Sequence, residues 1–338
     1  MANGGGIVRR PAVPRPIRIR RSVMSLPAND PILTFYGKAM QAMLAKPISE
    51  STSWRFQAAI HDYVAADDPL AKPGESFPPD TGTYWAQCEH RNWFFLPWHR
   101  MYLHHFEMIV LAEVMKQGGP EDWALPYWNY SAPGAQLLPP AFQQGSSTGL
   151  FIPQRDPNAN SGQPFLTLGP GNDALRGGDT DITCLQEPQY TATAPGGSNG
   201  FGGLKPVLPA LKNHGGGAGE GRVESLPHDS MHGAISGNDF LPDGSLKPLN
   251  QRGWMGNFTR APLDPIFWVH HCNIDRLWEV WIKAGHTNPT SADWLTNVTW
   301  HFRTATGADK EMKVSDVLDT RAAPLSYMYD DTKNPFGP

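Results

Sequence analysis

The sequence predicts a mainly α-helical single domain, residues 1–338, with a central antiparallel four-helix bundle and long surrounding loops. Three observations lead to this fold class. Apolar residues recur at intervals of three and four along several segments, as they do on one face of a helix. Proline and cap residues stand where helical patterns begin. The chain also contains 34 glycines and 33 prolines, which predict long ordered loops around a compact centre.

Three of the predicted helices lie in the first part of the chain. The first runs from Asp30 to about Lys46, and the second carries Trp54 to Val64. The third begins near Pro97, because proline is favoured at the first helical position, and it ends at Gly118–Gly119.

The remaining helices follow a long irregular stretch. Residues 133–221 are rich in Gly, Pro, Ser and Asn, and we expect them to wrap the core as loops and not to form a second domain. Helical patterns return at Pro227 to Ile235 and at Asp264 to Ile282, where Asp264 can cap the helix and Pro265 can open it. Bundles of this kind commonly build metal sites from facing side chains.

Composition excludes several classes of partner. A net charge of −4 implies neither nucleic acid nor an anionic membrane surface, and no apolar run approaches membrane-spanning length. The three cysteines Cys88, Cys184 and Cys272 are too few and too scattered for a disulfide framework. The basic start of the chain lacks the apolar stretch of a secretory signal, so a cytoplasmic location is favoured.

Six of the 12 histidines fall into two groups of three. The first group is His61, His90 and His99. Nine residues separate His90 from His99, which would put them on opposite faces of one continuous helix. Pro97 resolves this difficulty, because a helix that starts there leaves His90 on the preceding segment, free to turn inward.

The second group is formed by His228, His232 and one member of a His270–His271 pair. A spacing of four places His228 and His232 one turn apart on the same helix face. Adjacent helical residues point about 100° apart, so a choice between His270 and His271 is needed.

Two sites of three neutral imidazoles, with no carboxylate in a ligand position, suit copper better than magnesium, calcium or non-haem iron. Zinc would also suit three histidines and a water, so the ligand count alone leaves zinc open. A single histidine is more often a surface or core residue than a ligand. The joint occurrence of both groups, within long aromatic-rich contexts, makes a chance arrangement improbable.

This pairing of histidine groups resembles the type 3 copper proteins: tyrosinases, catechol oxidases and haemocyanins. The segment Ala124–Tyr130 (A-L-P-Y-W-N-Y) is similar to the family's L-P-Y-W-[DN]-[WY] signature, and Tyr327–Tyr329 is similar to its Tyr-x-Tyr motif. The resemblance implies that this motif pairs with an N-terminal arginine such as Arg20 or Arg21. Little chain follows Tyr329, which predicts a catalytic domain without a C-terminal covering domain.

The resemblance also implies a ligand set. Arthropod haemocyanins keep a single histidine in an Asp-Pro-x-Phe-Phe-x-x-His pattern, which matches His271 and leaves His270 beside the site. We therefore expect two bound copper ions, one for each group of three. The six predicted ligands are His61, His90, His99, His228, His232 and His271.

Cys88 precedes His90 by two residues. Fungal tyrosinases and molluscan haemocyanins have this C-x-H arrangement, with a thioether bond between the cysteine sulfur and the histidine ring. The resemblance predicts the same bond here; the alternative is a free buried thiol. Cys272 lies beside His271 but points away from the metal by helix geometry.

Four further residues are candidates for handling the substrate. Glu224 matches the glutamate that holds a water near the second copper in tyrosinases, although an acidic residue is also common at a helix start. Asp229 stands where many tyrosinases have asparagine. Phe258 lies where plant catechol oxidases often carry a bulky gate, and Gly233 would leave the other side of the entrance open. Phe258 could instead be a core residue, and Gly233 could be a helix-end residue.

The resemblance implies a polyphenol oxidase that uses O2 to oxidise catechols to o-quinones. Hydroxylation of monophenols is expected as well, so the partners would be small phenolic substrates and O2. One alternative is a catechol oxidase without monophenolase activity. A haemocyanin-like oxygen carrier and a structural zinc protein are the others.

Overall fold

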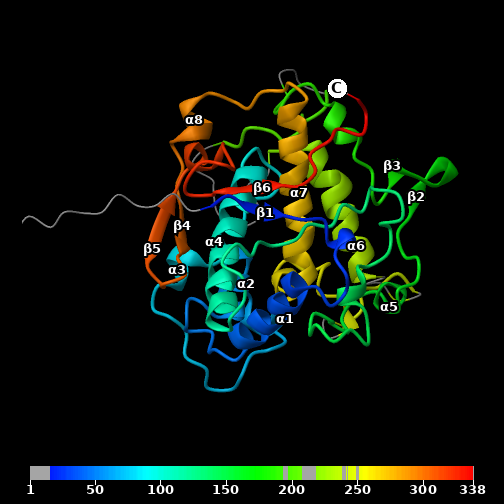
Figure 1. Cartoon of the computed structure of the whole chain (residues 1–338). Coiled ribbons are helices and arrows are strands. Elements are labelled where there is room, and N and C mark those ends of the chain that lie inside the picture. Colours follow the sequence, from blue (N-terminus) through cyan, green and yellow to red (C-terminus); the bar gives the residue numbers. More distant parts are fainter. Residues whose placement is uncertain are drawn as a thin grey trace, which may run out of the picture.

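The computed structural model describes residues 16–192, 197–207, 218–237, 241, 243–248 and 251–337. Helices dominate this part of the chain (Figure 1). The longer ones are α1 (Pro31–Leu44), α2 (Trp54–His61), α4 (Phe95–Lys116), α6 (Ser230–Ser236) and α7 (Pro265–Lys283). The shorter ones are α3 (Thr81–Tyr84), α5 (Pro157–Asn160) and α8 (Ala292–Leu295). The predicted mainly helical class is therefore confirmed.

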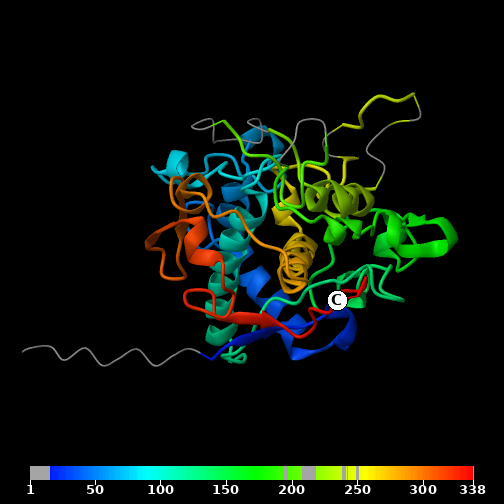
Figure 2. The same ribbon diagram turned by 90° about the horizontal axis from the view of Figure 1, so that it is seen from above.

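Helices α4 and α7 pack against each other at the centre, and α1 packs against both α4 and α2 (Figures 1 and 2). Three aromatic side chains join these elements. Phe106 of α4 stacks on Trp268 of α7 at an interplanar angle of 4°. Trp54 of α2 meets both rings edge-on, with centroids 5.1 Å from Phe106 and 6.2 Å from Trp268. Such pairs add about 0.5–1.5 kcal/mol each beyond the burial of their surface.

The helix starts follow the sequence closely. Asp30 caps α1 by accepting a hydrogen bond from the Ile32 amide at 2.8 Å. Asp264 caps α7 by accepting from the Ile266 amide at 2.9 Å, and Pro265 is its first residue, as predicted.

Two helix boundaries differ from the prediction. Helix α2 ends at His61 and not at Val64, because Asp62 adopts an extended conformation and its carboxylate accepts from the Tyr63 amide. Helix α4 begins at Phe95, two residues before Pro97. Proline is tolerated there because the first four amides of a helix have no partner within the helix.

The described part of the chain also contains three two-stranded sheets. Strand β1 (Arg18–Arg20) pairs in parallel with β6 (Tyr327–Tyr329), which brings the two ends of the described chain together. Strands β2 (Leu168–Gly169) and β3 (Asp173–Gly178) form a hairpin, and β4 (Trp300–Arg303) pairs with β5 (Asp309–Met312). The hairpin and α5 are the main ordered elements within the predicted long loops between residues 133 and 221.

Arg20 binds the Tyr-x-Tyr segment, as the resemblance implied. Its Nη1 donates to the Tyr329 hydroxyl at 2.9 Å, and its guanidinium lies 3.7 Å from the centroid of the Tyr327 ring. Arg20 is fully buried, whereas Arg21 is exposed. Among the described residues, no helix is both long and apolar enough to cross a bilayer.

Candidate metal centre

The structure brings the first three predicted histidines together. His61 is the last residue of α2, His99 lies in the first turns of α4, and His90 precedes α4 on an irregular segment, as predicted. Their ring centroids lie 5.2 to 5.9 Å apart. All three are buried. The arrangement leaves a common space between the rings for one ion.

The second group forms beside the first. His228 lies in a π-helical segment, Glu224–Asp229, His232 lies in α6, and His271 lies in α7. Their ring centroids are 4.5 to 5.6 Å apart. The His271 ring stacks on the His99 ring at 4.4 Å and 5°, so the two groups share a wall.

Backbone carbonyls set the orientation of three of these rings. The Nδ1 atoms of His61, His99 and His232 lie 2.9, 2.8 and 2.6 Å from the carbonyl oxygens of Phe258, Phe95 and Met255, respectively. A carbonyl only accepts, so each Nδ1 donates and each neutral ring keeps its lone pair on Nε2. This is how proteins prepare histidine ligands for a metal.

His228 shows most directly that the site fits a metal ion. Its Nδ1 lies 2.8 Å from a carboxylate oxygen of Asp229, and its buried Nε2 has no hydrogen-bond partner among the described residues. Burial lowers the pKa of His228 well below its usual value, and the neighbouring His232 lowers it further. A neutral imidazole with an unsatisfied, buried lone pair is a metal ligand in its binding form.

His270 and His271 both reach the second group, since one ligand atom from each lies within the same cluster as those of His228 and His232. The Nε2 atoms of His271 and His232 face each other at 3.4 Å. His270 stacks on Tyr130 at 5.8 Å, whereas the His271 ring stacks on that of His99 in the first group. The position of His271 between both groups supports it as the ligand, and this assignment stays a prediction.

Cys88 lies within the first group. Its sulfur is 3.2 Å from Nδ1 of His90 and 3.5 Å from Nε2 of His99. It is buried, as are Cys184 and Cys272, and all three are free thiols. Burial raises the pKa of the Cys88 thiol well above its usual value. The sulfur therefore lies beside the predicted partner ring.

Glu224 and Asp229 flank His228 in different environments. One Glu224 oxygen accepts from the Arg91 amide at 2.7 Å, whereas its buried Oε2 has no hydrogen-bond partner among the described residues. Burial raises the pKa of Glu224 well above its usual value. The Asp229 side chain is about half exposed and points one oxygen at His228. Glu224 thus keeps a free acceptor, while Asp229 orients a predicted ligand.

The cavity that leads to the histidines has a volume of about 250 Å³. Phe258 and Gly233, the two predicted entrance residues, both line it. The Phe258 side chain is 48% exposed, so it is not a core residue, and its ring lies 5.1 Å from that of His90. A Cβ at Gly233 would meet no atom within 4 Å, which leaves that side of the entrance open.

Apart from Phe258, one wall of this cavity was not predicted, nor was the part that its backbone plays. The segment Met255–Phe258 supplies two carbonyls, one for His232 of the second group and one for His61 of the first. Asn257 stiffens the segment, because its side-chain oxygen accepts from the amide and hydroxyl of Thr259 at 2.9 and 2.7 Å. The same residues therefore contact the substrate space and orient a histidine in each group. Backbone carbonyls have no side-chain signature, so only the Asn-x-Thr turn pattern could have pointed to this segment.

Comparison with known proteins places these features in one family. The profile of the common central domain of tyrosinase matches residues 51–284. The tyrosinase HcTyr1 of Hahella sp. (strain CCB-MM4) is 35% identical over 331 residues, which cover 93% of this chain and 63% of that protein. Catechol oxidase B of Solanum tuberosum is 31% identical, over 70% of this chain and 38% of its own length. This chain thus spans less than two thirds of either relative.

Solved structures agree with the sequence comparisons. The crystal structure of Grenache (Vitis vinifera) polyphenol oxidase superposes with a TM-score of 0.68 at 26% identity, covering 96% of this chain and 87% of that one. Latent apple tyrosinase superposes with a TM-score of 0.66 at 27% identity, covering 97% and 66%.

Proposed function

The chain belongs to the tyrosinase family, and from that premise we propose that it is a dicopper oxidoreductase that uses O2 to oxidise catechols to o-quinones. The observation that carries this proposal is the pair of adjacent histidine triads, in which the Nδ1 atoms of His61, His99 and His232 face backbone carbonyls so that each neutral ring carries its lone pair on Nε2. The proposed ligands are His61, His90 and His99 for one copper and His228, His232 and His271 for the other. We further propose that α2, α4, α6 and α7 form a four-helix bundle around them.

Bound copper would supply the redox chemistry with O2. The protein's part is to hold the ions, orient the phenol and exclude water. Neutral imidazoles suit this task because they add no charge to either oxidation state of copper. Burial lowers the pKa of His271 well below its usual value, and the pKa of His232 also falls, so both rings stay neutral for binding. The Phe258 ring and the open space at Gly233 would shape the path of a small phenol.

Glu224 is the proposed base. A phenol has an ordinary pKa of about 10, so it needs help to lose its proton. A buried carboxylate with a raised pKa is a stronger base than an exposed one, and Oε2 of Glu224 is free to accept a proton or hold a water. Asp229 would act by orienting His228, where other members have asparagine.

Hydroxylation of monophenols is the finer part of the proposal. The free acceptor of Glu224 and the open side at Gly233 favour it, whereas the exposed ring of Phe258 crowds the path. The relatives carry both names, tyrosinase and catechol oxidase. A catechol oxidase without monophenolase activity is therefore the second candidate, and Phe258 is the residue that favours it.

Replacing Glu224 with Gln should depress monophenol turnover much more than catechol turnover. A positioned base contributes on the order of 10²–10⁴-fold, and the catechol is the more easily oxidised substrate. Steady-state rates for a matched monophenol and catechol, with a catechol primer to remove any lag, measure the ratio. Glu121→Gln makes the same change at an exposed site and should alter neither rate. An equal loss on both substrates would show that Glu224 is structural.

We also propose that Cys88 becomes joined to the ring of His90. The bond forms with loss of the thiol hydrogen and one ring hydrogen, and copper with O2 takes up the two electrons. Peptide mass spectrometry of copper-loaded protein should find the joined residues two hydrogens lighter, with Cys88 resistant to alkylation after unfolding. Cys184, which is also buried and free, serves as the alkylatable control. An alkylated Cys88 in active protein would rule out the bond.

Two other functions of the site, oxygen transport and zinc binding, can be distinguished by simple measurements. An oxygen carrier of the haemocyanin type would bind O2 without consuming it in the presence of catechol. A zinc protein would show zinc on elemental analysis and no oxidase activity. The cavity that reaches His61, His90, His228 and His232 from the surface favours an enzyme over both.

A further inference from the structure

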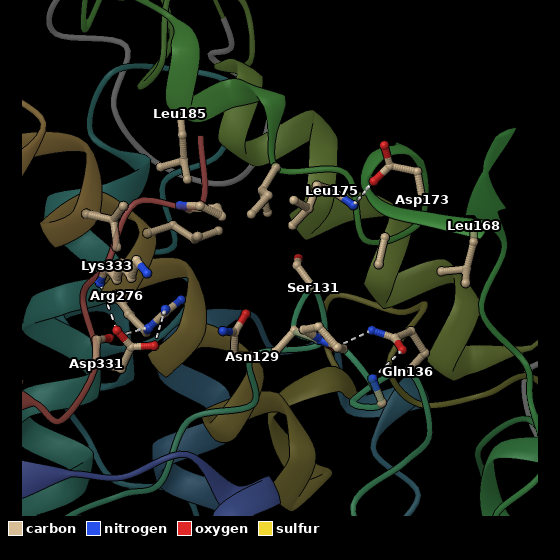
Figure 3. Close-up of a pocket in the computed structure, with 18 of the residues that line it drawn as sticks. Asn129, Ser131, Gln136, Leu168, Asp173, Leu175, Leu185, Arg276, Asp331 and Lys333 are labelled. Carbon is tan, nitrogen blue, oxygen red and sulfur yellow. Dashed lines mark hydrogen bonds and ion pairs between the residues drawn. The ribbon is translucent and has the colours of Figure 1, made fainter. Parts of the chain in front are cut away.

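A second cavity, of about 750 Å³, lies outside the histidine site (Figure 3). It is lined by the β2–β3 hairpin, the stretch of α7 from Arg276 to Val280, the loop after Trp128 and the segment that follows β6. None of the six predicted copper ligands lines it. Its volume falls within the range of small-molecule sites, which is roughly 300–1,000 Å³.

One end of this cavity is cationic. Arg276 is buried and held in place, because its Nε donates to the Asp331 carbonyl at 2.6 Å and its guanidinium lies 5.1 Å from the centroid of the Tyr127 ring. The Asp331 carboxylate is 56% exposed and only 3.6 Å from Nη2 of Arg276. Lys333 makes no ion pair with any residue that the structure describes. Two cations therefore face one carboxylate at this end, which gives the end a net charge of +1. The other carboxylate of the lining, Asp173, lies at the hairpin side of the cavity (Figure 3), 3.6 Å from Arg176.

The rest of the cavity is mainly apolar. Leu175 and Leu168 of the hairpin lie at the other end from Arg276 in Figure 3, and Leu277 and Val280 of α7 also line it. Asn129 lies between the two ends, and its side-chain amide makes no hydrogen bond with a described residue. The cavity thus combines an apolar body, a cationic end at Arg276 and Lys333, and the Asn129 amide, with the Asp173 carboxylate at the opposite, hairpin side.

We propose that this cavity binds a small monocarboxylate with an apolar body, separately from the phenol site. The carboxylate lies at Arg276 and Lys333, where the fixed guanidinium needs no rearrangement to bind it. The apolar body replaces water against the leucine side chains, which is the favourable term for such a ligand. Asn129 donates to the carboxylate from the side.

The probe is 5-phenylvalerate, an aryl carboxylate without a phenolic hydroxyl, so that the copper site cannot oxidise it. Isothermal titration of the copper-loaded protein should show one site outside the metal centre. Lys333→Glu should weaken binding roughly tenfold, because it replaces a cation by an anion at the head group. Ala174→Phe, which fills the cavity from β3, should abolish it. Octanoate, with the same head group, tells whether an aliphatic or an aromatic body is preferred; either preference supports the site.

Lys310→Glu makes the same charge change on β5, on the other side of the molecule from the hairpin, and should leave binding unchanged (Figures 1 and 2). Catechol oxidation should be the same in Lys333→Glu as in the wild type, because Lys333 is outside the copper site. The proposal is overturned if the probe does not bind. It is also overturned if binding survives both cavity variants, or if the probe competes with catechol, which would place it at the copper ions.

Discussion

Replacing His232 with alanine is expected to remove the second copper ion and abolish catechol oxidation. His232 is partly buried between His228, His271 and the Met255 carbonyl, which holds its ring in place, and its loss leaves the second group with only two of its three predicted ligands. Loss of an outer partner of a metal ligand already costs roughly 10- to 100-fold in affinity or activity. Loss of the ligand itself should cost more than about 100-fold.

Elemental analysis provides a measurement that does not depend on activity: copper should fall from two ions per chain to one. His301→Ala is the matched control, because His301 is a partly exposed histidine on β4 that pairs with Asp309. It should keep both ions and full activity. An active His232→Ala protein with two copper ions would mean that the second site has a different ligand, with His270 the first alternative.

The positions of the histidines could be predicted because their geometry is local. A spacing of four puts His228 and His232 on neighbouring turns whether the backbone is α-helical or, as here at His228, π-helical. Pro97 indicated that a helix starts between His90 and His99, so that the two histidines need not lie on one continuous helix. The carbonyls of Met255 and Phe258 could not be predicted, because they belong to a loop whose course is set by contacts far away in sequence.

The contrast between local patterns and contacts distant in sequence also explains which parts of the fold could be predicted. Helices with strong periodicity and a capping residue, such as α1 and α7, were located within one or two residues. Strands β1 and β6 were not predicted as strands, since each has three residues and their partners are about 300 residues apart. Too little local pattern exists in three residues to indicate a strand. The resemblance to the Tyr-x-Tyr motif suggested that an N-terminal arginine contacts Tyr327–Tyr329, but it did not suggest that the two segments pair as parallel strands.

Asp275 of α7 forms hydrogen bonds and ion pairs with β1, β6 and α4. It lies on α7 one turn after His271 and accepts hydrogen bonds from the hydroxyls of Tyr327 and Tyr329 at 2.6 and 2.5 Å. Its carboxylate also pairs with Arg100 at 2.5 Å and with Arg20 at 3.2 Å. Burial raises the pKa of Asp275, but the two arginines and the two hydroxyls outweigh burial, so its pKa lies below the usual value.

Replacing Asp275 with Asn is expected to lower the free energy of unfolding by about 3–5 kcal/mol, the cost of breaking a buried ion pair by removing one partner. Asn keeps the size of the side chain but leaves buried Arg100 and Arg20 without their shared carboxylate. Equilibrium unfolding in denaturant at neutral pH measures the loss. Asp331→Asn is the control, since Asp331 pairs with Arg276 at 3.6 Å but is 56% exposed, and it should change stability little.

The pH dependence gives a second check on the same charge. A carboxylate whose folded pKa is depressed stabilises the fold above its unfolded pKa, about 3.9 for aspartate. That contribution is lost as the pH falls through the lower folded value. The wild type and Asp275→Asn should therefore differ most at neutral pH and converge in acid. A difference that stays constant down to low pH would show that Asp275 acts through packing and hydrogen bonds and not through its charge.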